Sequence, residues 1–81
     1  MKLTRREREV SRLVAEGHTN ESIGHQLSIG IATVKKHVQA ATSKLGCKNR
    51  VELAVMVVTE KYEAQLQKLR LEYSMFDLNS H

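Results

Sequence analysis

Apolar residues recur at spacings of three and four along this chain, and no proline interrupts the pattern. Proline and glycine are the residues that break helices, and here there is no proline and only four glycines. Much of the remainder is Leu, Val, Ala, Glu, Lys, Gln and Arg, which favour helix. With 81 residues, the chain has room for one small domain of three or four helices. We therefore predict an all-α fold.

The first helix has clear signals at both ends. Thr4 and Glu7 have the three-residue spacing of a capping box, in which each side chain accepts from the other residue's backbone N–H. Gly17 suits the left-handed conformation that commonly ends a helix. We expect a helix over about residues 5–16. Its apolar face would consist of Val10, Leu13 and Val14.

Two further helices are expected in the middle of the chain. Thr19 or Asn20 can cap a short second helix, which contains Gly24. That glycine either permits close helix packing or is simply tolerated, at about 1 kcal/mol relative to alanine. Residues 28–30 have the length of the turn in a helix-turn-helix, and a third helix is expected over about 31–45.

A fourth helix begins after Asn49, which together with Glu52 repeats the capping-box pattern. Its first turns present an apolar stripe, interpreted as core plus dimer surface. A heptad-like seam continues the helix and indicates a dimerisation or partner contact, with fraying from about residue 77. The stripe consists of Val51, Ala54, Val55 and Val58, and the seam of Tyr62, Leu66, Leu69, Tyr73 and Phe76.

The charge distribution indicates a polyanionic partner. Residues 1–50 hold ten Lys and Arg against four Glu, whereas residues 51–81 hold three against five Asp and Glu. Residues 22–51 contain no carboxylate, yet they carry five cations. A short basic helix with an apolar opposite face is typical of proteins that bind double-stranded DNA, because lysines neutralise its phosphates.

Several short motifs, in order and at matching gaps, resemble the LuxR-type (NarL/FixJ) helix-turn-helix domain. The resemblance covers roughly residues 3–59. Its motifs here are LTRREREV (3–10), AEG (15–17), NESI (20–23), TVKKH (33–37), and KLG (44–46) with Arg50. Departures from the family pattern are Ser11, Gly24, Gly30 and Ala41, of which Ser11 and Ala41 thin the core and Gly30 weakens a cap.

The resemblance implies a four-helix DNA-binding domain over residues 1–59, with the helix-turn-helix element at 20–39 and a helical extension over 60–81. By position, the residues expected to read base edges are Lys35, Lys36 and Gln39. Those expected to contact phosphates are Thr19, Asn20, Ser22, Thr33, His37 and Lys44. The expected dimer contact consists of Val51, Ala54, Val55, Val58 and Tyr62.

Physical reasoning agrees with the base-reading assignment. Residues 35, 36 and 39 lie within about one turn near the start of the third helix, the part that reaches deepest into a major groove. Lysine can donate to guanine, and glutamine can pair with adenine. His37 can equally serve in helix packing. Arg50 can contact a phosphate or pair internally with Glu7 or Glu9, and we favour the internal role.

Other function classes find little support. The chain offers no defensible catalytic triad or glycine-rich phosphate loop, and its histidines lack metal-ligand spacing, so we expect no enzyme, no metal, no cofactor and no small-molecule ligand. No apolar run approaches transmembrane length. The single Cys47 is expected to be a small core residue and fits a reducing cytoplasm.

We therefore expect a cytoplasmic bacterial transcription regulator that binds double-stranded DNA, as a homodimer. The chain is either a free-standing regulator or the output domain of a longer one, and Met1 directly before the motifs favours the first. The alternative is an interaction module that pairs with another regulator through its fourth helix. A heterodimeric regulator would combine both interpretations.

Overall fold

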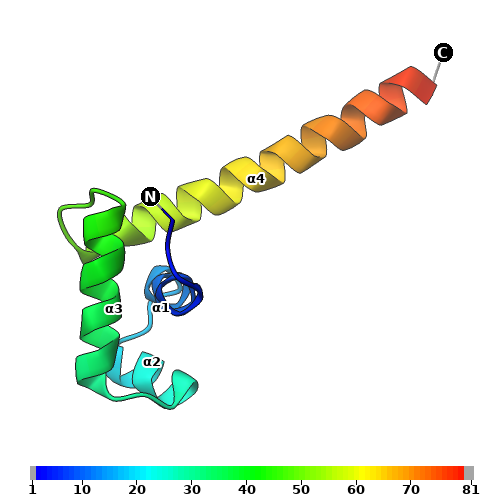
Figure 1. Cartoon of the computed structure of the whole chain (residues 1–81). Helices are drawn as coiled ribbons and strands as arrows, with labels where there is room; N and C mark the ends of the chain where they lie inside the picture. Colours follow the sequence, from blue (N-terminus) through cyan, green and yellow to red (C-terminus); the bar gives the residue numbers. More distant parts are fainter. Residues whose placement is uncertain (1, 80–81) are drawn as a thin grey trace.

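The computed structural model describes residues 2–79, with side chains as far as Ser74 (Figure 1). These residues form four α-helices and no β-strand: α1 (Arg5–Ala15), α2 (Asn20–Leu27), α3 (Ile31–Lys44) and α4 (Arg50–Asn79). The prediction of an all-α, four-helix fold is confirmed, and α1 and α3 each end one residue before the expected position. We call residues 2–59 the head; beyond it α4 projects as a single rod (Figure 1).

Short-range hydrogen bonds explain where α1 and α2 begin. The backbone N–H of Glu7 donates to Thr4 Oγ1 at 3.1 Å, and Thr4 N–H donates to Glu7 Oε1 at 2.9 Å, which confirms the capping box. At α2 the cap is Thr19, whose Oγ1 accepts from the Ser22 N–H at 3.1 Å. Gly17 follows α1 with φ +92°, as the helix-end signal predicts.

The start of α4 differs in detail from the predicted capping box. Asn49 caps the helix as expected, because its Oδ1 accepts from the Glu52 N–H at 2.9 Å. The Glu52 carboxylate, however, accepts from the backbone N–H of Lys48 at 2.9 Å rather than from the cap residue itself. The Glu52 side chain therefore reaches one residue further back than in a reciprocal capping box, in which it would accept from the Asn49 N–H.

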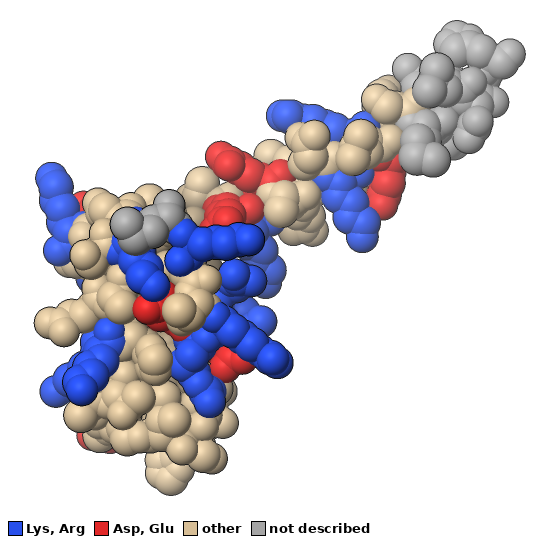
Figure 2. Space-filling view, in the orientation of Figure 1, with Lys and Arg blue, Asp and Glu red and all other residues tan. Residues whose placement is uncertain are grey.

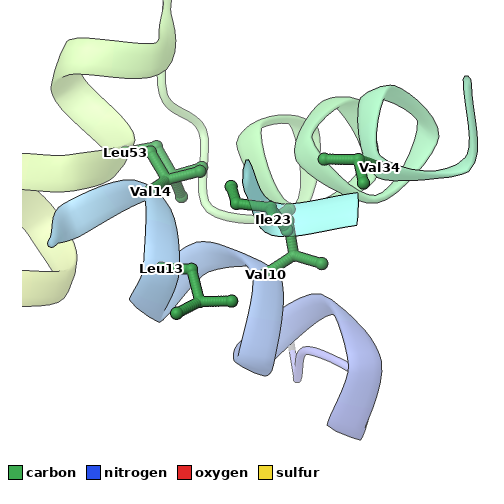
Figure 3. Close-up of a cluster of buried hydrophobic side chains, with 7 residues drawn as sticks. Val10, Leu13, Val14, Ile23, Val34 and Leu53 are labelled. Carbon is green, nitrogen blue, oxygen red and sulfur yellow. The ribbon is translucent and has the colours of Figure 1, made fainter. Parts of the chain in front are cut away.

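One core holds the head together, and all four helices contribute to it. Figure 3 shows side chains from the four helices converging on this cluster. Its buried members are Val10, Leu13, Val14, Ile23, Val34, Ala41 and Leu53. Leu53 is fully buried and is the contribution of α4, together with the partly buried Ala54 and Val57.

The position of Leu53 corrects the expected core face of α4. The expected stripe contained Val51, Val55 and Val58, yet these side chains are 70%, 59% and 54% exposed. Leu53 lies two residues from both Val51 and Val55, which places it on the opposite side of the helix. The apolar residues of α4 therefore form two faces, and only the face of Leu53 packs into the head.

The two small residues expected to thin the core are both accommodated. Ser11 is buried, and its hydroxyl donates to the Glu7 carbonyl at 2.7 Å, so no polar group is left unpaired there. Ala41 is fully buried against the same cluster. Cys47, in the loop before α4, is partly buried against the core, as expected of a small core residue.

Gly24 is required by the close approach of the turn that follows α2. A Cβ atom on Gly24 would lie 2.7 Å from the Ile29 carbonyl oxygen, well inside contact distance. The Ile29 N–H donates to the Gly24 carbonyl at 2.9 Å, which holds the two segments together. Ser28 makes the turn by adopting a left-handed conformation with φ 56°. Of the two interpretations of Gly24, close packing is the one that the structure supports.

The rod continues further than the sequence pattern suggested. α4 is helical to Asn79, past the fraying expected from about residue 77, while Ser80 and His81 lie outside the described residues. The seam residue Phe76 lies on this helix, but its side chain is also outside the described part. None of the described helices is both long and apolar enough to cross a membrane.

Candidate nucleic-acid interface

The exposed face of α3 carries the three predicted base-reading residues. Val34 and Ala41 turn inward to the core, whereas Lys35, Lys36 and Gln39 are exposed. Because a helix turns about 100° per residue, Lys35 and Gln39 lie on one line and Lys36 lies beside it. The structure thus brings these three side chains together on the exposed surface of α3, in its N-terminal half.

Ile31 extends this face by one turn and was not singled out from the sequence. It begins α3, is 43% exposed, and lies four residues before Lys35 on the same line. An apolar side chain at this place can contact a thymine methyl group in the major groove. The spacing of residues 31, 35 and 39 was a usable signal, but the sequence-based prediction assigned only polar side chains to this face.

The head carries most of the positive charge of the described residues. Figure 2 shows Lys and Arg side chains gathered over the head, whereas along the described part of α4 they alternate with Glu. α3 itself contains no carboxylate, and its N-cap Gly30 makes no side-chain capping bond. The first N–H groups of α3 are therefore available to water or to an anion, next to two lysines.

The predicted phosphate contacts fall into groups with different surroundings. Thr19 and Thr33 are exposed, one at the cap of α2 and one in the first turn of α3. Ser22 is half-buried, with its hydroxyl 3.2 Å from His18 Nδ1 and 3.1 Å from the Gln26 amide nitrogen. His37 is half-buried on α3, a position that fits either of its two interpretations.

Asn20 is held by Arg50 across the head. Arg50 Nη1 donates to Asn20 Oδ1 at 2.6 Å, and Nη2 donates to the His18 carbonyl at 2.8 Å. The internal role favoured for Arg50 is confirmed, but the expected partners Glu7 and Glu9 were wrong. This bridge ties the start of α4 to the start of α2, so the side chain of Asn20 positions α2.

Lys44 also has an internal partner, which changes its expected role. Its Nζ lies 2.7 Å from Glu7 Oε1, with the Glu7 carboxylate almost buried. The Lys44 hydrogen bond, and then the one from the Thr4 N–H, hold the pKa of Glu7 below its ordinary value, although burial opposes them. Lys44 therefore joins α3 to α1 and is not a free cation on the reading face.

This ion pair predicts an acid-sensitive stability. A lowered folded-state pKa contributes stability that is present above about pH 5 and is lost as the pH falls through the lowered pKa. Urea unfolding of the wild-type chain at a series of pH values should show this loss. In Glu7→Gln the midpoint should be lower near neutral pH and should fall less on acidification. Glu60→Gln, which removes an exposed carboxylate from α4, should keep the wild-type profile; equal profiles for Glu7→Gln and wild type would contradict the assignment.

The five predicted dimer residues are not equivalent. Val51, Val55, Val58 and Tyr62 are exposed along α4, whereas Ala54 packs partly against the core. Four of the five thus lie on a surface free to meet a partner. Among the described residues there is no group of three His, Cys, Asp or Glu side chains that could hold a metal ion.

Comparison with known proteins identifies the class to which this fold and surface belong. The family model for bacterial regulatory proteins of the luxR family matches residues 1–57. The spore germination protein GerE of Bacillus subtilis is 42% identical over 53 residues, which cover 65% of this chain and 72% of GerE. The chain therefore belongs to the luxR family, as its motifs predicted.

Two longer relatives carry the same domain. The transcriptional regulatory protein LiaR of Bacillus subtilis is 49% identical over 53 residues, 65% of this chain. The nitrate/nitrite response regulator protein NarL of Escherichia coli K12 is 44% identical over 59 residues, 73% of this chain. The chain matches about a quarter of each, 25% of LiaR and 27% of NarL.

Family membership decides between the function classes weighed above. The chain carries the DNA-binding helix-turn-helix domain of a transcription regulator and is not an enzyme. Membership of this family also favours DNA binding over the alternative function, an interaction module that keeps the fold but does not bind DNA.

Proposed function

We propose that this chain binds double-stranded DNA in a sequence-specific manner, with the N-terminal half of α3 in the major groove, and so regulates transcription in the cytoplasm of a bacterium. The observation that carries this proposal is the exposed face of Lys35, Lys36 and Gln39 on a helix without carboxylates. A helix of this width fits the major groove, where each base pair presents a distinct pattern of donors and acceptors.

The three side chains have complementary roles in this proposal. Lys35 and Lys36 donate to guanine O6 and N7 or to nearby phosphates, and Gln39 pairs with adenine. Ile31 adds an apolar contact one turn earlier. Such a face distinguishes bases by hydrogen bonding and shape, while the charge supplies the affinity.

Phosphates are contacted, in our proposal, from the sides of this face. Thr19, Ser22 and Thr33 offer hydroxyl groups near the helix starts, and His37 adds a ring N–H. We leave Asn20 and Lys44 with the internal roles that their hydrogen bonds give them. Their substitution is expected to act through the fold rather than through a lost phosphate contact.

The active form in this proposal is a homodimer on a two-fold symmetric site. The exposed side chains of Val51, Val55, Val58 and Tyr62 support it, because an apolar stripe of this kind is stabilised by burial against a partner. Two-fold symmetry would place two α3 helices in major grooves about one turn of DNA apart.

Selection from a random duplex library tests the proposal directly. The purified full chain is incubated with the library at low salt, and bound DNA is sequenced over successive rounds. We expect enrichment of a sequence with two related half-sites about 10 base pairs apart. A Gln39→Ala variant should lose preference at one position of each half-site. Salt-sensitive binding without any enriched sequence would contradict sequence-specific reading.

A further inference from the structure

A groove of about 630 Å³ lies between the segment that follows α3 and the first turns of α4. Ligand sites in proteins commonly have volumes of about 300–1,000 Å³. The floor of this groove is apolar, and α4 supplies most of its lining. The apolar side chains that line it are Leu45, Cys47, Val51, Val55 and Met56.

Three carboxylates surround the apolar floor, although the chain as a whole has a net charge of +4. They belong to Glu52, Glu60 and Glu63, and no Lys or Arg lines the groove. None of the ion pairs among the described side chains involves these three residues. Lys48, in the adjoining loop, contacts Glu52 only through its backbone N–H, at 2.9 Å. The carboxylates are therefore available to a cationic partner.

The spacing of the charges indicates the shape of that partner. Figure 2 shows acidic side chains on the part of α4 that leaves the head. Along one face of α4 the groove residues follow at spacings of four, three and four, and carboxylates stand at both ends. This face is roughly 17 Å long, or about three helical turns. Its members are Glu52, Met56, Thr59 and Glu63.

The sulfur-containing side chains make the floor adaptable. Met56 is 41% exposed, and its Sδ atom lies 4.0 Å from Cys47 Sγ. Because methionine is flexible and polarisable, it adapts to apolar partners of different shape. An exposed methionine on an apolar floor beside unpaired carboxylates is a surface that suits a basic amphipathic helix, which lays its apolar side into such a groove.

The charge of the groove disfavours the other macromolecules that this chain could meet. DNA and anionic membranes would be repelled by the three carboxylates. An isologous contact with a second copy would bring the same carboxylates against one another. A head-to-tail contact through the arginine-rich exposed face of α1 would leave the floor uncovered, because that face has no large apolar side chain.

The groove is also distinct from the dimer contact proposed above. The two surfaces share only Val51 and Val55, which lie on the boundary between them. The centre of the groove, at Met56 and Thr59, lies about a quarter of a turn around α4 from the centre of the dimer contact. The reading face of α3 shares no residue with the groove.

We propose that this groove binds a basic amphipathic helix of a partner protein, about three turns long. The apolar side of that helix lies on the floor, and its Lys or Arg side chains pair with Glu52, Glu60 and Glu63. Since the reading face remains free, one chain can hold DNA and the partner at the same time.

A synthetic helix tests the proposal on the full chain in the absence of DNA. The probe is a fluorescent peptide of about 18 residues of leucine and lysine, with leucines at i, i+3, i+4 and i+7. By fluorescence anisotropy at low salt, it should bind with a dissociation constant below about 100 μM. Glu60→Gln/Glu63→Gln should weaken binding about five-fold or more. The matched control Glu16→Gln/Glu72→Gln removes two exposed carboxylates from elsewhere and should stay within about two-fold of wild type.

Two further probes separate a helix from simpler ligands. A peptide of the same composition, shuffled so that it has no apolar face, should bind at least about ten-fold more weakly. Decyltrimethylammonium, a small amphiphilic cation, should also bind more weakly than the helical peptide. Equal binding of the shuffled peptide would show attraction by charge alone and would overturn the proposal. Equal binding of the small cation would make the groove a small-molecule site and would overturn it as well.

Nuclear magnetic resonance locates the peptide on the molecule. Backbone amide shifts should change most at Gly46, Cys47, Met56 and Thr59. Largest changes elsewhere, or no binding of the helical peptide by the folded chain, would refute the assignment.

Variants on the other two surfaces keep this site apart from the proposed function. Val58→Asn lies on the proposed dimer contact but outside the groove, and it should change peptide binding by less than about two-fold. Lys35→Ala/Lys36→Ala should lose DNA binding yet keep peptide binding within about two-fold. A peptide affinity that falls equally in Val58→Asn and in Glu60→Gln/Glu63→Gln would place the peptide on the dimer contact and contradict the proposal.

Discussion

Replacing both reading lysines, in Lys35→Ala/Lys36→Ala, should weaken binding to duplex DNA by about 2–4 kcal/mol at low salt, roughly 30-fold to 1000-fold. Both side chains are exposed on α3, so their removal takes away contacts with DNA without opening the core. The dependence of the binding constant on salt should also become shallower, by up to about two in the logarithmic slope. Fluorescence anisotropy with a random-sequence duplex at two salt concentrations measures both effects.

The matched control removes the same charge from elsewhere on the molecule. Lys61→Ala/Lys68→Ala takes two exposed lysines from α4, beyond the head. If α3 is the reading helix, this control should bind DNA within about two-fold of wild type, since charges beyond a Debye length are largely screened. Equal losses in the two double variants would mean that net charge, and not the face of α3, governs binding.

Leu53→Ala should lower the free energy of unfolding by about 2–5 kcal/mol. Leu53 is fully buried and is the side chain by which α4 enters the core shared with α1, α2 and α3. A domain of this size rarely has more than about 3–5 kcal/mol of stability, so the variant should be largely unfolded at 37 °C. Urea denaturation followed by circular dichroism measures the change.

Two further variants keep this prediction testable. Leu53→Met conserves volume and should lose less than about 1.5 kcal/mol, which keeps its transition within a measurable range. Val55→Ala removes an exposed side chain from the other face of α4, and under dilute conditions it should change stability by less than about 0.5 kcal/mol. Comparable losses for Leu53→Ala and Val55→Ala would show that the two faces of α4 have been assigned wrongly.

How far the site could be predicted depended on the range of the interactions involved. Residues 35, 36 and 39 fall on one helical face by spacing alone, because that depends only on the geometry of a single helix. The partners of Lys44 and Arg50 could not be predicted in this way. Glu7 lies 37 residues from Lys44 and Asn20 lies 30 residues from Arg50, so each pairing exists only after the helices have packed.

Local chemistry within a few residues determined the helices of this protein. The capping groups of Thr4, Thr19 and Asn49, together with Gly17, set where the helices begin and end, and each acts through a hydrogen bond or a dihedral angle of its own segment. The short motifs along the chain likewise sufficed for its family, because they record helices and turns at set gaps.

Only the tertiary structure decided which of two apolar faces of α4 is core. Leu53 and Val55 are both apolar and both lie at helical spacing from other apolar residues, so the pattern by itself is satisfied by either choice. Burial depends on which face α1, α2 and α3 can cover at once, a property of three helices meeting a fourth. The same packing required glycine at position 24, because the carbonyl oxygen of Ile29 comes within 2.7 Å of where a Cβ atom would lie.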